Sequence, residues 1–160
     1  MNRLVLSPAG RRLVLLFIVL GVLAWVGLLG VGIISGARAT HTARQLDRNH
    51  AGAVAAFQGY GAETQTCAAT RAGLSCLHDA DLRLATAVER FRNGLDGLKF
   101  PSNAVSDAEQ VRTDVTKIDD LLHFLASAPA PQYQRSVGQL EILTNQFDAD
   151  YQTLRDQLPA

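Results

Sequence analysis

The sequence lacks the short motifs that mark common catalytic and nucleotide-binding sites. It has no H-E-x-x-H, G-x-S-x-G, G-x-G-x-x-G or G-x-x-x-x-G-K-[ST] pattern, and its histidines include no pair four residues apart. No segment alternates apolar and polar residues over a useful length, which a half-buried strand would require. We therefore expect an all-α protein that is not an enzyme and that holds neither a metal nor a cofactor.

Lysine is also scarce, and the charges are unevenly distributed. The chain has two lysines, Lys99 and Lys117, against 13 arginines, and its 15 basic and 15 acidic residues cancel. All 15 acidic residues follow residue 34, whereas Arg3, Arg11 and Arg12 precede the first apolar run. The part of the chain after residue 34 is therefore mildly acidic. Because binding to nucleic acid needs a clustered basic face, we expect no nucleic-acid partner.

One long apolar run, residues 13–34, contains no charged residue. As a helix it would extend roughly 33 Å, enough to cross a hydrocarbon core of about 30 Å. Basic residues stay on the cytoplasmic side, so the three arginines before the run place the N-terminus inside. We expect a cytoplasmic tail (1–12), a single-pass plasma-membrane helix (13–35) and an extracytoplasmic domain (36–160).

A cleaved signal peptide is the competing interpretation of this run. Ala37-Arg38-Ala39 fits a small-x-small cleavage pattern, although the apolar run is longer than an ordinary signal sequence. Both interpretations place the domain outside the cytoplasm. If the run stays in the membrane, Gly32, Gly36 and Trp25 could contact another helix, and a homo-oligomer is possible.

The two cysteines, Cys67 and Cys76, both follow the apolar run. An even number of cysteines in an oxidising compartment predicts a disulfide. Their spacing is not C-x-x-C and no second pair exists, which argues against a metal or redox site. The closed loop of about ten residues corresponds to a stabilisation of roughly 2.5–3 kcal/mol in the chain-entropy model. We expect this bond to staple the turn between the first two outer helices.

Apolar residues recur at helical spacing in three clean stretches of the outer domain, and steps of three and four place each set on one stripe of a helix. These stretches are Leu84, Val88, Phe91, Leu95 and Leu98; Val111, Val115, Ile118, Leu122 and Leu125; and Val137, Leu140, Leu143, Phe147, Tyr151, Leu154 and Leu158. A looser stretch runs from Leu46 through His50 to Phe57.

Helix breakers divide these stretches into four predicted helices. We expect them at about residues 40–58 (or to 72), 78–98, 106–126 and 131–158. Gly59-Tyr60-Gly61 should interrupt or end the first. Ser106 and Glu109 form a capping box for the third, and Pro131 suits the first turn of the fourth. Short connections favour antiparallel neighbours, so the predicted fold is a transmembrane helix followed by an up-down four-helix bundle.

The remaining titratable groups have simple structural interpretations. We interpret His50 as a hydrogen-bonded residue at a helix interface and His123 as part of a surface ion pair with the Asp119-Asp120 pair. His78 with Asp79 and Asp81 could attract a cation, but the two carboxylates have an ordinary explanation at the positive end of the second helix. The Asp119-Asp120 pair and the pair Asp148 and Asp150 lie beside the apolar stripes and should each be on a solvated face.

The last two fifths of the chain resemble a known pattern. GLDGLKFPSNAVSDAEQVRTDVTKIDDLL, followed by a helix ending in LRDQLPA, resembles uncharacterised actinobacterial proteins that are exported or membrane-anchored and carry a helical domain. The resemblance covers about residues 95–160 and implies no activity. The excess of arginine over lysine, with much alanine, glycine, valine and leucine, fits a GC-rich genome.

These observations predict a membrane-anchored helical protein of the bacterial cell envelope with an interaction or accessory role. Its expected partners are the lipid bilayer and a membrane or envelope protein. The alternative is a helical bundle that senses a small molecule and signals through a membrane partner. A sensor requires a polar-lined pocket between helices, whereas an accessory protein requires an exposed apolar surface.

Overall fold

A computed structural model describes residues 39–67 and 73–159. Residues 39–160 form one compact unit. The predicted membrane span and its candidate contacts Trp25, Gly32 and Gly36 lie outside the described residues. Among the helices that are described, none is both long and apolar enough to cross a membrane.

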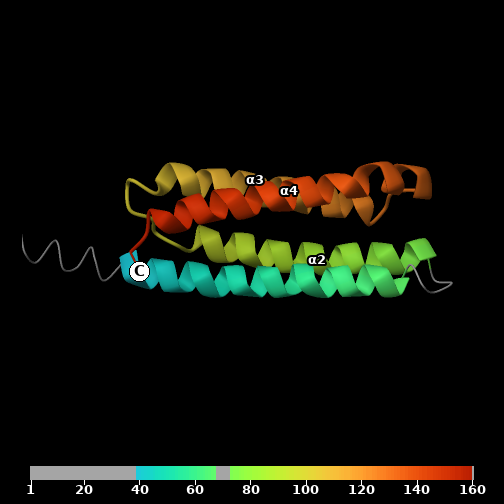
Figure 1. Ribbon diagram of the computed structural model, residues 1–160, viewed down its shortest axis with the longest axis horizontal. Helices are drawn as coiled ribbons and strands as arrows, with labels where there is room; N and C mark the ends of the chain where they lie inside the picture. Colours follow the sequence, from blue (N-terminus) through green and yellow to red (C-terminus); the bar gives the residue numbers. More distant parts are fainter. Residues whose placement is uncertain (1–38, 68–72, 160) are drawn as a thin grey trace, which may run out of the picture. The chain divides into compact units, whose positions relative to one another are not determined.

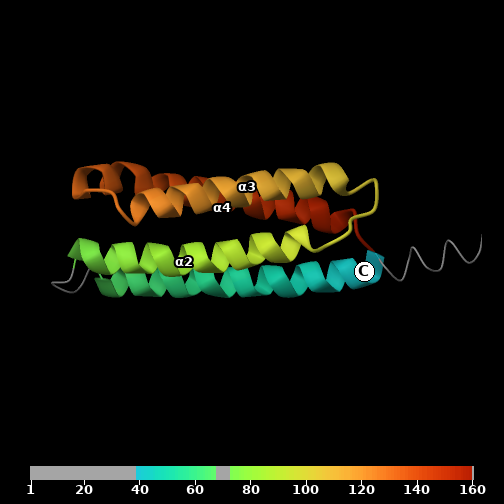
Figure 2. The ribbon, with the colours of Figure 1, turned by 180° about the vertical axis from the view of Figure 1, so that it is seen from behind.

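The described chain is all-α, with four helices and no strand within residues 39–67 and 73–159. The first helix covers 39–67 and is called helix 39–67 below. It is followed by α2 (Gly73–Asp96), α3 (Val105–Leu125) and α4 (Ala130–Asp156). Each helix runs antiparallel to the one before it, and the four lie side by side as a bundle (Figures 1 and 2). The predicted up-down order is therefore confirmed for this part of the chain.

The predicted apolar stripes meet in the centre of the bundle. All five stripe residues of α3, from Val111 to Leu125, are buried. Phe91 of the α2 stripe contacts Phe147 of the α4 stripe. Their rings meet edge to face, with 5.4 Å between the centroids. Leu46 and Ala53 complete this core from helix 39–67. Period-3.6 spacing thus identified the buried face of each helix.

Helix 39–67 continues through Gly59-Tyr60-Gly61, so the predicted break there is wrong. The Tyr60 side chain packs against the core, and its hydroxyl donates a hydrogen bond to Asp81. Two glycines in a helix cost about 2 kcal/mol relative to alanine. Packing of the helix against its neighbours outweighs this cost, as it does for most helices in proteins.

Two predicted helix starts are also corrected. The α2 helix begins at Gly73 rather than near residue 78, with φ of +51° at this glycine, and its first turn carries no acidic residue. The α3 helix has Ala104 at its N-cap with no side-chain capping bond, so the predicted capping box does not form. Glu109 pairs instead with Arg112 in the next turn. In α4, the expected proline does lie in the first turn.

Candidate functional site

The disulfide lies where helix 39–67 ends and α2 begins. Cys67 is buried at the last described residue of its helix, and Cys76 lies in the first turn of α2. Their Cα atoms are 5.5 Å apart. The predicted pairing is confirmed, and it holds the first two helices together at one end of the bundle.

A buried carboxylate, Asp81, lies about one turn further along α2. Its side chain is 0% exposed. The Tyr60 hydroxyl donates to Asp81 Oδ1 at 2.7 Å, and the Tyr133 hydroxyl lies 3.4 Å from the same oxygen. Asp81 Oδ2 is buried and has no hydrogen-bond partner in the described chain. We call Asp81, Tyr60, Tyr133 and His78 the Asp81 cluster; it joins three helices.

Burial dominates the electrostatics of this cluster. It raises the pKa of Asp81 because the charged form loses its hydration, although the two tyrosine hydrogen bonds and the nearby His78 act in the opposite direction. Burial likewise raises the pKa of Tyr60 and of Tyr133. His78 Nε2 lies 3.0 Å from the Ala128 carbonyl oxygen, which can only accept, so this nitrogen carries a proton.

The interpretation of Asp81 as a residue at the positive end of α2 is therefore wrong. It lies in the third turn and faces the core, three residues before Leu84 on the buried stripe. A carboxylate in phase with an apolar stripe was the sequence signal for this site. The partners Tyr60 and Tyr133 had no comparable signal, because their contact with Asp81 depends on how three helices meet.

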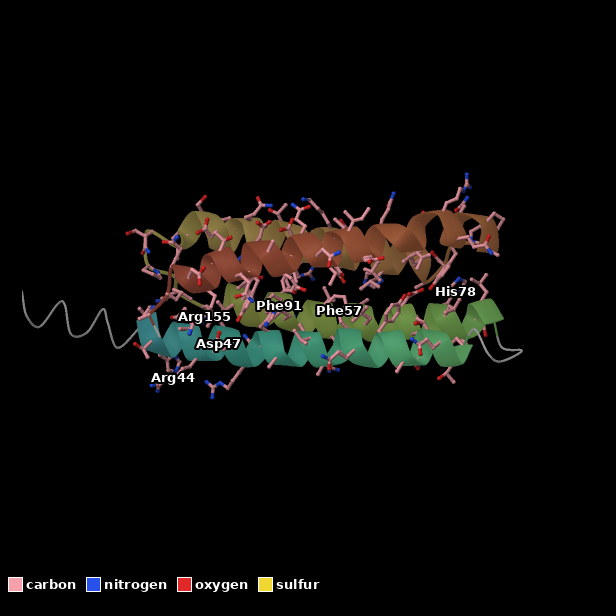
Figure 3. The ribbon with its side chains drawn as sticks, in the orientation of Figure 1. Arg44, Asp47, Phe57, His78, Phe91 and Arg155 are labelled. Atoms are coloured by element: carbon pink, nitrogen blue, oxygen red, sulfur yellow. A yellow bond between two sulfur atoms is a disulfide. The ribbon has the colours of Figure 1, made fainter. Side chains whose placement is uncertain are left out.

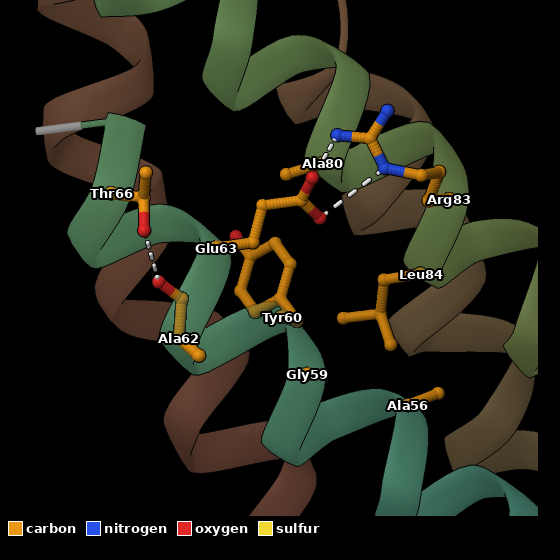
Figure 4. Close-up of a pocket in the computed structure, with 9 residues that line it drawn as sticks. All are labelled: Ala56, Gly59, Tyr60, Ala62, Glu63, Thr66, Ala80, Arg83 and Leu84. Atoms are coloured by element: carbon orange, nitrogen blue, oxygen red, sulfur yellow. Dashed lines mark hydrogen bonds and ion pairs between the residues drawn. The ribbon is translucent and has the colours of Figure 1, made fainter. Parts of the chain in front are cut away.

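A hollow of about 460 Å³ lies beside this cluster, between helix 39–67 and α2, and we call it the Glu63–Arg83 hollow. Tyr60 and Glu63 line it on one side, and Arg83 and Leu84 line it on the other (Figure 4). Arg83 Nε donates to Glu63 Oε2 at 3.2 Å across the hollow. This exposed ion pair adds little stability, because water screens it.

A second hollow, the apolar groove, lies on the other side of Tyr60, between helix 39–67 and α4. Its volume is about 270 Å³. Its lining is mostly apolar and comprises Phe57, Tyr60, Val137, Leu140, Glu141, Thr144 and Asn145. Phe57 points from helix 39–67 into the space between the helices (Figure 3). Tyr60 therefore lines both the Glu63–Arg83 hollow and the apolar groove.

His50, Tyr151 and Asp47 form a second polar cluster where helix 39–67 faces α4. The His50 ring stacks on the Tyr151 ring at 3.6 Å between centroids. The Tyr151 hydroxyl and Arg155 Nε both donate to Asp47 Oδ1, at 2.9 and 2.8 Å (Figure 3). His50 thus lies at a helix interface as predicted.

The predicted hydrogen bond of His50 is not seen at Nε2. That atom is buried without a hydrogen-bond partner among the described residues and lies 3.8 Å from Asp148 Oδ1. Burial lowers the pKa of His50, and the nearby Asp148 and Asp47 offset only part of this effect. The helix interface therefore favours the neutral ring.

Two further aspartates of α3 are buried rather than solvated. Asp114 is 0% exposed, with Lys117 Nζ at 3.2 Å and Gln110 Nε2 at 3.3 Å from its Oδ1. Burial, together with a hydrogen bond that protonated Asp114 donates to Asp150, raises the pKa of Asp114. Asp150 therefore takes part in this contact with α3 and is not simply solvated as predicted.

Asp119, predicted to lie on a solvated face, is only 6% exposed. Arg92 Nη1 of α2 lies 2.8 Å from its Oδ2. His123 Nε2 lies 3.6 Å from its Oδ1, which agrees with the predicted ion pair. Asp119 thus links two helices.

Several titratable side chains of the described bundle join helices, as Asp81 and Asp119 do. Over residues 39–67 and 73–159, no three His, Cys, Asp or Glu side chains gather into a metal-binding group. Hollows along helix 39–67 are among the surface features of the described bundle. A comparison of the chain with family models, with curated proteins and with solved structures finds no match.

Proposed function

We propose that this chain is a membrane-anchored interaction protein of the bacterial cell envelope, with its helical bundle outside the cytoplasm and no catalytic activity of its own. The observation that carries the interaction role is the apolar groove between helix 39–67 and α4. It offers a partly buried aromatic ring, Phe57, at a surface where an apolar side chain of a partner protein would lose contact with water.

The anchoring and the topology rest on the sequence. The uncharged run 13–34 and the arginines before it support an anchor with the N-terminus inside. The disulfide between Cys67 and Cys76 supports an oxidising location for the bundle. Protease added to the outside of intact spheroplasts should remove a tag placed after residue 160. A tag that stays protected until the membrane is lysed would contradict this topology.

Site-specific photocrosslinking in living cells tests the interaction role. A photoreactive phenylalanine analogue is placed at Phe57 or Thr144 in the apolar groove, and at Thr116 on the exposed surface of α3 as a control. We expect a discrete adduct with one envelope or membrane protein from the two groove positions only. The same adducts from Thr116, or none from the groove, would contradict the proposal.

A sensing role is the second candidate, and the two charged side chains of the Glu63–Arg83 hollow favour it. Glu63 and Arg83 pair with each other across a space of about 460 Å³, and a small zwitterion such as an amino acid would replace this pair with one contact to each side chain. The full chain in neutral detergent is titrated with a panel of amino acids while its unfolding temperature is measured. An increase that Arg83→Ala abolishes would favour a sensor that signals through a membrane partner. An unchanged unfolding temperature across the panel would leave the interaction role as the better account.

A further inference from the structure

A third hollow, between helix 39–67 and α2, has a basic character. Its volume is about 250 Å³, and we call it the Arg48–Arg90 hollow. Arg48, Asn49 and Gly52 line it from helix 39–67, and Arg90 lines it from α2. We propose that this hollow binds a phosphate group. The inference is independent of the interaction role proposed above.

The arginines of this hollow differ from most others in the bundle. Arg83, Arg92, Arg112 and Arg155 each pair with a carboxylate. Arg48 and Arg90 are exposed, and neither pairs with a carboxylate of the described residues. None of the described residues that line the hollow is acidic. Two guanidinium groups from adjacent helices therefore share a space without a counter-charge.

The Asn49 side chain adds a donor that is already removed from water. Asn49 Nδ2 is buried and has no hydrogen-bond partner within the described chain. Leaving such a donor unpaired is unfavourable, so a turn of the Asn49 side chain that brings this amide to a phosphate oxygen in the hollow would add affinity. The side chain fits because residue 94 is glycine: a Cβ there would lie 2.4 Å from Asn49 Nδ2.

The chemistry of the three side chains selects the ligand. Guanidinium groups form strong, directional hydrogen bonds with phosphate oxygens, and the amide of Asn49 supplies a neutral donor. Gly52 leaves open space, because a Cβ there would meet nothing within 4 Å. The phosphate could belong to a soluble phosphate compound or to the headgroup of an anionic lipid. Both present the same charged group to the same donors.

Nuclear magnetic resonance of the full-length chain in neutral detergent micelles tests the site. Sodium phosphate is titrated against sodium chloride at equal ionic strength, and the amide signals of Asn49 and Gly52 are followed. We expect saturable shifts with phosphate only. The double variant Arg48→Ala, Arg90→Ala should bind about tenfold more weakly or worse, since each arginine supplies a charge-assisted hydrogen bond.

Two further variants separate binding from folding. Gly52→Glu places a negative charge in the hollow without a clash, and it should abolish the phosphate shifts while the helix stays intact. Arg135→Ala is the matched control, because Arg135 is also exposed and bonds only to the Pro131 carbonyl. This control should leave the binding unchanged.

A second arm replaces dissolved phosphate with lipid nanodiscs. Phosphatidylglycerol discs that shift the same signals, where phosphatidylcholine discs do not, would identify a lipid headgroup as the source. Shifts with sodium phosphate alone would identify a soluble phosphate compound. The proposal is overturned if neither probe shifts the signals, or if the double arginine variant binds as well as the unchanged chain.

Discussion

At the scale of single residues, Asp81 stands out because a carboxylate in an apolar core is unfavourable unless its oxygens are hydrogen-bonded. One oxygen of Asp81 has two tyrosine hydroxyls near it, and the other has no partner among the described residues. The tyrosines come from helix 39–67 and from α4, so the two hydroxyls tie both of these helices to α2. The packing of three helices therefore depends on the hydrogen bonds and charge of one buried side chain, Asp81.

Removing the Tyr60 hydroxyl should show how much its hydrogen bond to Asp81 contributes to the stability of the bundle. Tyr60→Phe deletes the 2.7 Å hydrogen bond to a buried carboxylate and should lower the free energy of unfolding by about 1.5–3 kcal/mol. Urea denaturation at pH 7 measures it. Tyr133→Phe is the comparison, and its cost should be smaller because that hydroxyl lies 3.4 Å away. An equal loss of unfolding free energy in the two variants would show that the distance from the hydroxyl to Asp81 does not determine the loss.

The site residues were less predictable than the core residues, and the reason is physical. A buried apolar face produces a periodic signal along one helix, and that spacing by itself identified Leu84, Val88 and Phe91 as core residues. The contact between Asp81 and Tyr60 involves residues 21 positions apart on two helices. Its formation depends on the register between the helices, and no local pattern carries that information.

At the scale of helices, the ends were harder to predict than the existence of the elements. The capping box at Ser106 and Glu109 is a local preference worth about 1 kcal/mol. The chain instead begins α3 at Val105, with the Ala104 side chain in the core. Burial of the helix face therefore decided where α3 starts. The break expected at Gly59-Tyr60-Gly61 was likewise a local preference that packing overrides.

The glycines of the bundle provide a test of helix continuity. Gly59→Ala adds a methyl group with nothing within 4 Å, so it should raise the free energy of unfolding by about 0.5–1 kcal/mol through higher helix propensity. Thermal and urea denaturation measure this gain. A loss of stability would indicate that residue 59 needs a conformation open only to glycine.

Gly94→Ala is the matched comparison for this variant. The added Cβ would lie 2.4 Å from Asn49 Nδ2, so Asn49 would have to move and the gain in propensity should be lost. Adding Asn49→Ala to Gly94→Ala should recover stability if this contact is the cause. Equal gains for Gly59→Ala and Gly94→Ala would exclude a tight contact at residue 94.

At the scale of the whole molecule, the pH dependence of folding stability combines groups whose pKa values shift in opposite directions. Burial raises the pKa of Asp81 and Asp114, so their protonated forms favour the folded state. Their stabilising contribution is full below pH about 3.8 and is lost as the pH rises through the raised pKa values. The lowered pKa of His50 acts oppositely: its contribution is present above pH about 6.5 and is lost as the pH falls.

Neutral replacements isolate the carboxylate part of this dependence. The double variant Asp81→Asn, Asp114→Asn cannot ionise at these positions, so its stability relative to the unchanged chain should be highest near pH 7 and should decline toward pH 4. Urea denaturation between these pH values measures the difference. Asp120→Asn, at an exposed position beside buried Asp119, is the control and should show a small difference throughout. A difference for the double variant that does not change with pH would contradict the assignment.

The chain enters and leaves the bundle at the same end, since helix 39–67 begins where α4 finishes (Figure 1). This geometry has a mechanical consequence. A force between residue 39 and residue 159 would unzip two neighbouring helices and load the Asp47–Arg155 contact near that end first. A force between residue 39 and the end that holds Cys67 and Cys76 would shear the helices along their length, where many contacts share the load. A protein held under tension at its N-terminal side would therefore resist far more if its partner gripped the disulfide end.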